Sequence, residues 1–120
     1  MKQDIERIHV GPRLSDVVVF NKVAYLAGQV PENTLDQGLH AQTQEVLQII
    51  DALLAQVGSD KSRILSCQIF LKDIGQIAEM NRAWDAWIPA GHTPARATVQ
   101  AAMADPRWAV EIVLSAALRD

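Results

Sequence analysis

Arg96 is the residue whose type and position most clearly suggest chemistry. It interrupts residues 94–101, a stretch that otherwise has the small and branched side chains of a strand. Arginine is rarely buried without a partner. Its planar fork of donors matches a carboxylate in two parallel hydrogen bonds, which a lysine cannot reproduce. Arg96 is therefore the candidate anion-binding residue of this chain.

Glu111 is the second candidate, because it is the one side chain in an apolar stretch that could act as a general acid or base. Strand alternation places Arg96, Thr98 and Gln100 on one side and small residues on the other. The small side suits helix packing, so we expect the Arg96 side to line a cleft. A cross-strand ion pair between Arg96 and Glu111, without catalytic function, is the alternative.

The remaining reactive residue types show no catalytic arrangement. Cys67 lies in the middle of a predicted strand and is expected to be a buried small hydrophobe rather than a nucleophile. Trp84 and Trp87 have helical spacing, which favours core or interface packing over pocket lining. No nucleophilic triad or glycine-rich phosphate loop is present. No metal site or cofactor is expected, since the histidines lack ligand spacing: His9, His40 and His92.

The elements that must position these residues alternate between strands and helices. Short strands are predicted over residues 5–10, 17–20 and 23–28, the last two joined by a turn at Asn21 and Lys22. Apolar residues at helical spacing predict a helix over residues 39–57, closed by Gly58. A strand over residues 64–71 follows.

The second half of the chain repeats this alternation. A helix is expected from Asp73 to about Pro89, with Gln76 completing a variant capping box. Final strands are predicted over residues 95–102 and 109–117. Their connection is too short for a crossover helix, so they should be antiparallel neighbours if they pair. The pattern is an α+β fold with both helices available to one face of a single sheet.

Coverage of that sheet bears on assembly. Residues 17–20 and 69–71 are apolar on both faces, as in strands that are covered on both sides. Two helices cover only one face, so an obligate homo-oligomer whose sheets pack together is the economical solution. The alternative is that these residues tolerate partial exposure.

Length and composition exclude several classes of protein. The chain has 120 residues, 49% of them hydrophobic and 21% charged, which indicates one folded domain spanning residues 1–120. A net charge of -3 argues against nucleic acid as a partner. One cysteine, no apolar signal-peptide core near Met1 and no membrane-spanning stretch together predict a cytoplasmic protein.

The order of several short motifs resembles the Rid family, the reactive intermediate deaminases formerly called the YjgF family. The motifs, spread over residues 13–118, are Gly28-Gln29-Val30-Pro31, Gln42-Thr43, Asn81-x-x-Trp84, Pro94-Ala95-Arg96 and Val110-Glu111-Ile112. The resemblance implies a chorismate-mutase-like fold with a mixed sheet, and a homotrimer whose sheets form a barrel with ligand clefts between subunits. It also implies cofactor-free hydrolysis of 2-imino or enamino acids, which are products of pyridoxal-phosphate enzymes, to 2-oxo acids and ammonia.

The same resemblance implies roles for individual residues. Arg96 matches the arginine that holds the substrate carboxylate, and Glu111 matches a glutamate that helps to order the hydrolytic water. Gly28 lies where the backbone approaches the ligand, and Asn81 matches an asparagine of the second helix. The substrate-binding set is therefore expected to comprise Arg96, Gly28, Asn81, Thr98, Leu14 and Trp84.

Two departures from the family pattern bear on substrate and activity: Leu14 stands where the deaminases usually have tyrosine, and Thr98 stands where many have cysteine. Trp84 and Trp87 also replace smaller aromatic residues, which suggests a pocket of altered shape. A binding protein of regulatory or chaperone-like function, using the same cleft for a small carboxylate, is the alternative to an enzyme. Ribonuclease activity, attached to some family members, is disfavoured by the acidic charge and the lack of a basic, aromatic stripe.

Overall fold

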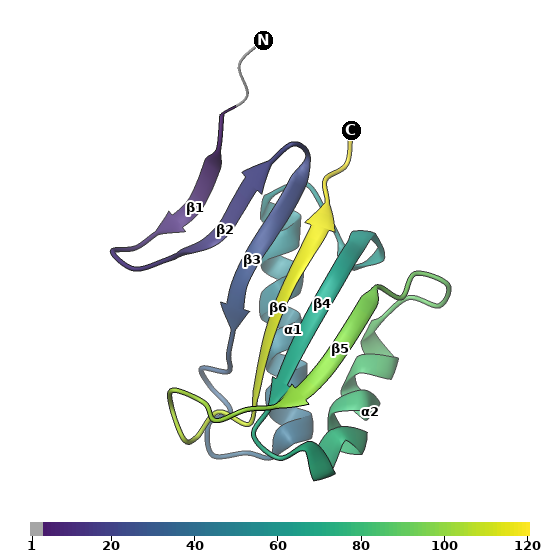
Figure 1. Ribbon diagram of the computed structural model, residues 1–120. Coiled ribbons are helices and arrows are strands. Elements are labelled where there is room, and N and C mark those ends of the chain that lie inside the picture. The colour runs from purple at the N-terminus through teal and green to yellow at the C-terminus, as the bar shows by residue number, and fades with distance from the viewer. Residues whose placement is uncertain (1–3) are drawn as a thin grey trace.

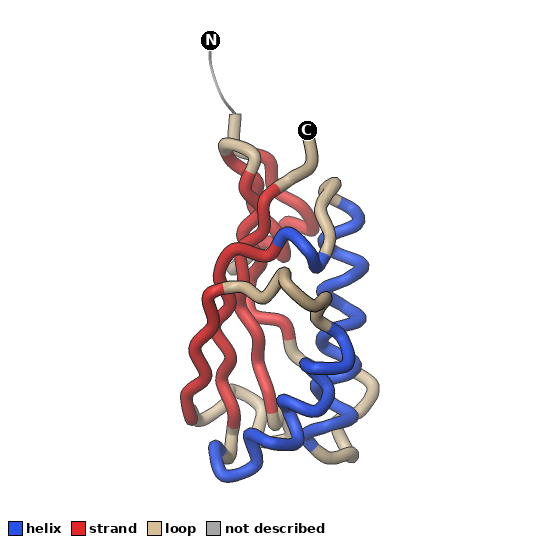
Figure 2. Tube along the Cα trace, turned by 90° about the vertical axis from the view of Figure 1, so that its right-hand side faces the viewer, coloured by secondary structure: helices blue, strands red, loops and turns tan. Residues whose placement is uncertain are grey.

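The predicted strands and helices form two layers, with a single sheet in one and both helices in the other (Figures 1 and 2). The computed structural model describes residues 4–120. Met1–Gln3, the start of the segment in which no signal peptide is expected, lie outside the described residues. The sheet is mixed, with strand order β1-β2-β3-β6-β4-β5. The elements are β1 (Glu6–Val10), β2 (Ser15–Phe20), β3 (Val23–Gln29), α1 (Leu39–Gln56), β4 (Ile64–Leu71), α2 (Ile77–Trp87), β5 (Ala95–Gln100) and β6 (Val110–Ala117).

Helix α1 confirms the helical periodicity of its apolar residues. One face is buried against the sheet, including Val46, Ile50 and Leu54, each of which is fully shielded from solvent. The helix ends where Gly58 takes a positive φ of 79°, a conformation that glycine adopts without steric cost. The amide of Ser59 then donates to the carbonyl of Leu54. Neither described helix combines the length and apolarity that a membrane crossing requires.

The hairpin of β2 and β3 is also confirmed. Asn21 and Lys22 both take positive φ values, 53° and 61°, as a two-residue type I′ turn demands. The turn fixes the register in which Phe20 lies opposite Val23 and Val17 lies opposite Leu26. Val17 and Leu26 therefore share the face that α1 covers, and both are buried.

The last two strands, expected to be antiparallel neighbours if they pair, do not pair, because β4 lies between them. β4 pairs with β5 in parallel and with β6 antiparallel. Helix α2 makes the crossover that parallel strands need. The connection from β5 to β6 passes over the end of β4, where the amide of Ala101 donates to Leu71 O and the amide of Lys72 donates to Ala109 O. These bonds let a short loop bypass a strand.

The start of the second helix differs from the predicted capping box. The Asp73 carboxylate accepts the amide of Gly75 and opens a single 3-10 turn, Ile74–Gln76, before α2 begins at Ile77. Asp73 thus acts as an N-cap, as expected, by accepting a hydrogen bond from a free backbone amide. It caps the 3-10 turn, however, and not α2 itself. The Gln76 amide donates to Asp73 O at 3.1 Å, but its side chain makes no capping hydrogen bond, and Gln76 is the residue that precedes α2.

The sheet has one face without helices, which Figure 2 shows edge-on. We call it the open face. It carries exposed apolar side chains, among them Phe20 (38% exposed), Tyr25 (51%) and Val99 (44%). On the opposite face, Ile69 and Ile112 are completely buried. The residues predicted to be apolar on both faces therefore have one side in the core and one on the open face.

Candidate functional site

Arg96 lies on the helix side of β5, at the edge of the sheet. It is directly opposite Cys67 on β4, which is buried, so the two side chains share the face that α2 covers. The expectation that the small side of β5 packs against a helix is therefore wrong. Ala95, Ala97 and Val99 belong to the open face instead. The pairing of β5 with β4 places them there, while Trp84 of α2 contacts Arg96 on the other face.

The ring of Trp84 lies beneath the guanidinium of Arg96. The Arg96 Cζ lies 5.0 Å from the centre of the Trp84 ring, which is within the range of a cation–π contact. Trp84 itself is buried and packs against Trp87 with a centroid separation of 5.6 Å. The Trp87 indole donates to Asp51 Oδ2 on α1 at 2.9 Å. These contacts hold the Trp84 ring in place beneath Arg96.

A hollow of about 300 Å³ opens between α2 and the beginning of β5. We call it the Arg96 hollow. Its lining residues are Asn81, Trp84, Asp85, Thr93, Pro94 and Arg96. Within the described chain, Arg96 has no carboxylate within 4.0 Å, so its donors face the hollow without an acidic partner. The arrangement can bind a small anion.

Thr98 lies beside this hollow but does not line it. It shares the face of Arg96, opposite the buried Ile69. Its hydroxyl oxygen is shielded from solvent and has no hydrogen-bond partner among the described residues. A buried hydroxyl without a partner costs free energy. In a single chain the Thr98 hydroxyl is therefore not accessible to a ligand in the hollow.

Gly28 and Glu111 form a second cluster, on the open face. A Cβ atom built on Gly28 would overlap Glu111 Oε2 and lie 2.8 Å from Cδ, so a side chain at this position would force the carboxylate to move. Glu111 is half-buried and lies opposite Phe70, which also pairs with Val99. Its side chain therefore points away from the face of Arg96. The cross-strand ion pair considered above is excluded within one chain.

Leu14 belongs to neither cluster. It is 59% exposed, precedes β2 and lies at the β1–β2 edge of the sheet, whereas Arg96 lies at the β5 edge. Figure 1 shows these edges on opposite sides of the molecule. The expected site residues thus occupy three places, and a single chain brings together only the group around Arg96 and the pair on the open face.

Cys67 is buried behind Arg96 and confirms the expectation of a small core residue. Burial raises the pKa of its thiol to about 12, although the nearby Arg96 charge opposes the shift. The thiolate that a nucleophile requires is therefore not populated near neutral pH. His92 also stays outside the site, because it is exposed in its loop and its Nδ1 lies 3.0 Å from Ala90 O.

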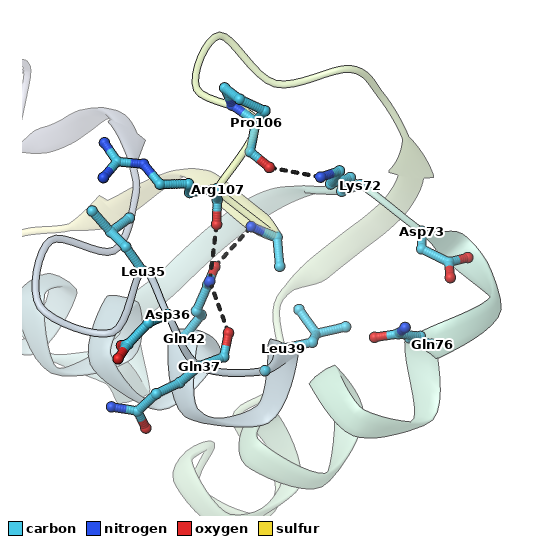
Figure 3. Close-up of a pocket in the computed structure, with 12 residues that line it drawn as sticks. Leu35, Asp36, Gln37, Leu39, Gln42, Lys72, Asp73, Gln76, Pro106 and Arg107 are labelled. Carbon is cyan, nitrogen blue, oxygen red and sulfur yellow. Dashed lines mark hydrogen bonds between the residues drawn. The ribbon is translucent and has the colours of Figure 1, made fainter.

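A larger hollow of about 480 Å³ lies near the start of α1 (Figure 3). Several of its polar groups make hydrogen bonds within the chain. The buried Gln42 donates to Gln37 O and Arg107 O and accepts the amide of Ala109 at 2.7 Å. Lys72 Nζ donates to Pro106 O at 2.6 Å. Gln42 of the Gln42-Thr43 motif therefore joins α1 to the loop before β6, and it holds the strand that carries Glu111.

Sequence reasoning missed Asp85 and Thr93, which also line the Arg96 hollow. Asp85 follows Asn81 by four residues, so both lie on one stripe of α2. That spacing is visible in the sequence and could have identified Asp85. Thr93 lies in the loop before β5, where no periodicity indicates which side chains face the hollow. In the described chain, no three potential metal-ligating side chains gather at one point.

Comparisons with known proteins agree on one family. A family model described as "Endoribonuclease L-PSP" matches residues 5–118. A RutC family protein from Haemophilus influenzae is 54% identical over 112 residues, which cover 93% of this chain and 97% of the relative. The RutC family protein YoaB from Escherichia coli is 50% identical over 114 residues, covering 95% and 98%. The crystal structure of a YjgF-family protein from Neisseria meningitidis superposes with a TM-score of 0.90 at 48% identity, covering 98% of this chain and 97% of that one.

Proposed function

This chain belongs to the Rid (YjgF) family, and we propose that it hydrolyses short 2-imino or enamino acids to 2-oxo acids and ammonia without a cofactor. The observation that carries the proposal is the position of the Arg96 guanidinium. It lines a small hollow, lies over the Trp84 ring and has no acidic partner in the described chain. A carboxylate with one reactive group beside it fits such a cation.

The complete site lies between copies of the chain. Arg96 and Glu111 point to opposite faces of one sheet, so they act on one substrate only where the β5 edge of one copy meets the open face of another. The exposed Phe20, Tyr25 and Val99 give the open face the apolar surface that such packing would bury. A homotrimer, the assembly that the family implies, supplies three equivalent junctions.

The chemistry needs few groups because an iminium carbon is already electrophilic. Arg96 binds the substrate carboxylate and orients the C=N bond. Glu111 of a neighbouring copy holds a water and accepts its proton as the oxygen attacks the imine carbon. The protonated Glu111 then returns this proton to the carbinolamine nitrogen. The C–N bond breaks as the hydroxyl oxygen forms the new C=O bond, and the hydroxyl proton leaves with ammonia as ammonium, which frees the 2-oxo acid. The rate gain comes from orientation and electrostatics.

An assay in which a threonine-derived imine is generated in situ tests the role of Arg96. The Arg96→Ala variant should lower kcat/KM for 2-oxo acid release on the order of a hundredfold or more, because the carboxylate loses its charged partner. Arg96→Lys should recover only part of the loss, since an ammonium lacks the planar fork. Light scattering on each variant checks that the oligomer is intact.

Arg82→Ala is the matched control. Arg82 also lies at α2 but is exposed and pairs with Glu79 at 2.9 Å, so its removal should leave turnover unchanged. Wild-type rates in Arg96→Ala, or an equal loss in both variants, would show that Arg96 does not anchor the substrate.

A carboxylate-binding protein without turnover is the second candidate. Leu14 favours it, because it offers no hydroxyl at the position where the family deaminases usually have tyrosine. Binding of 2-oxo acids without any acceleration of imine hydrolysis would support this candidate. Leu14→Tyr would then be expected to introduce measurable deaminase activity.

We extend the proposal to exclude nucleic acid and membranes as partners and to place the protein in the cytoplasm. The net charge of -3 offers little phosphate neutralisation. The description of the matching family names an endoribonuclease, so RNA cleavage can be measured directly on protein purified to homogeneity. Cleavage that copurifies with the oligomer and disappears in Arg96→Ala would contradict this part of the proposal.

A further inference from the structure

We propose that the Arg96 hollow selects monocarboxylic over dicarboxylic acids, and that Asp85 is the residue that imposes this selection. The inference rests on the proposed function for the identity of the acids as 2-imino or 2-oxo acids. It goes further by naming their charge class and a residue outside the family motifs.

The hollow contains one charge of each sign. Arg96 supplies the cation and Asp85 the anion, while the other lining residues are neutral: Asn81, Trp84, Thr93 and Pro94. Neither Arg96 nor Asp85 takes part in an ion pair within 4.0 Å among residues 4–120. The two charges are therefore both available to a ligand, and neither neutralises the other by direct contact.

Other charges on α2 leave this balance unchanged. Glu79 and Arg82, which lie in the two turns before Asp85, form an ion pair with each other at 2.9 Å. Lys61 lies over the Trp87 ring at 5.6 Å from its centre and does not line the hollow. Asp85 is the acidic side chain that a ligand on Arg96 meets within the same chain.

Because the hollow is small, the charges of its lining residues affect which acids can bind. A volume of about 300 Å³ is at the small end of ligand pockets, so both ends of a short acid stay close to the lining side chains. With the first carboxylate on Arg96, a second one would lie within several ångströms of Asp85. Like charges at that separation near a protein surface disfavour binding by roughly tenfold, after allowance for the exposure of Asp85.

A second copy would reinforce the selection. If Glu111 of a neighbouring chain completes the site, the ligand faces one cation and two anions. That environment suits a molecule with one carboxylate and a protonated imine, because the iminium charge is attracted by both acids. A dicarboxylic imine would place an additional negative charge among them.

Binding of two stable 2-oxo acids tests the selection without requiring turnover. 2-Oxohexanoate and 2-oxoglutarate have similar length but differ by one carboxylate. Calorimetry on the wild-type oligomer should give an affinity for 2-oxohexanoate about tenfold higher. Asp85→Asn should strengthen 2-oxoglutarate binding by about the same factor and leave 2-oxohexanoate within about twofold. High salt should reduce the preference of the wild type, because screening weakens exposed charges.

Asp36→Asn is the matched control, since Asp36 is exposed, lies outside the Arg96 hollow and changes the net charge equally. It should leave both affinities unchanged. Equal affinity of the wild type for the two acids, absence of binding, or an equal change for both acids in Asp85→Asn would overturn the inference. Thermal unfolding of each variant shows whether an equal change reflects damage to the fold.

The outcomes for the two proposals are separable. A wild type that shows the binding preference without accelerating imine hydrolysis overturns the deaminase and retains the selection by Asp85. A wild type that hydrolyses imines of both charge classes equally overturns the selection and retains the deaminase.

Discussion

The two faces of the sheet differ in what the chain itself provides for them. On the helix face, Val17, Ile69 and Ile112 are all fully buried beneath α1 and α2. On the open face, Tyr25 and Val99 expose about half of their area and Glu111 lies against Gly28. One chain thus completes its core but places the two proposed site residues apart, with Arg96 on one face and Glu111 on the other. Under the proposed function, folding and catalysis would depend on different surfaces.

The largest effect on stability is expected on the helix face. Ile112→Ala should lower the free energy of unfolding by about 2–5 kcal/mol, because it removes buried methyl groups and leaves a cavity in close-packed surroundings. Denaturant unfolding of wild type and variant measures the difference. A loss well below 1 kcal/mol would mean that this face is less tightly packed than its burial indicates.

The second prediction concerns the contact by which α2 supports Arg96. Trp84→Leu should weaken carboxylate binding by about 3- to 30-fold, because the guanidinium loses its cation–π contact with the indole ring. Trp84→Phe also reduces the side chain but keeps a ring, so it should retain more affinity at comparable stability. Calorimetry with 2-oxobutanoate measures both. Equal affinities in the two variants would show that packing, and not the ring, positions Arg96.

Substitutions on the open face should affect assembly more than the stability of the fold, the opposite of substitutions in the core. Tyr25→Thr and Val99→Thr keep strand-forming residues, so the stability of the fold should change by only about 1 kcal/mol or less. The proposed oligomer should dissociate at a higher protein concentration than that of the wild type, because its apolar contact is interrupted. Light scattering over a dilution series measures this. Ile74→Thr, an exposed apolar residue on the 3-10 turn, is the control and should leave the mass unchanged.

The smallest expected effect is a pH dependence of the free energy of unfolding that comes from Glu45, a residue of α1. Partial burial alone would raise the pKa of this carboxyl, but the Thr34 hydroxyl and the amides of Asn33, Glu32 and Thr34 hold it below the ordinary 4.5. A lowered pKa stabilises the fold above the unfolded value, and the contribution is lost as pH falls through the folded value.

Glu45→Gln should therefore be less stable than the wild type at neutral pH, and the gap should narrow as the pH falls below about 4.5. Thermal unfolding at several pH values measures the gap. A difference that stays constant down to acid pH would mean that the charge of Glu45 contributes nothing beyond its hydrogen-bonding shape.

The sequence predicted those parts of the fold that depend on local pattern. Helix α1 and strand β4 appear where the apolar spacing placed them, and Gly58 closes the helix, because each signal lies within the element itself. The order of β4, β5 and β6 could not be predicted, since the loop that bypasses β4 is held by hydrogen bonds from Lys72 and Ala101 to distant residues.

The candidate site also has a part that the sequence predicted and a part that it could not predict. Residue types and family motifs singled out Arg96 and Glu111, but neither alternation nor composition tells which face of β5 meets a helix. The side with Arg96 was expected to be free of helices, yet it faces Trp84, because an aromatic ring can pack against a guanidinium. The separation of Arg96 from Glu111 is a matter of register, and only the structure reveals it.

Mixed oligomers of two inactive variants test most directly whether the site is shared between copies. Arg96→Ala and Glu111→Gln would each be inactive alone. After unfolding together and refolding at equal amounts, about a quarter of the junctions should combine an intact Arg96 from one chain with an intact Glu111 from the other. We predict that imine hydrolysis returns to roughly that fraction of the wild-type rate. Mixed oligomers that form but recover no activity would contradict a site assembled from opposite faces of two chains.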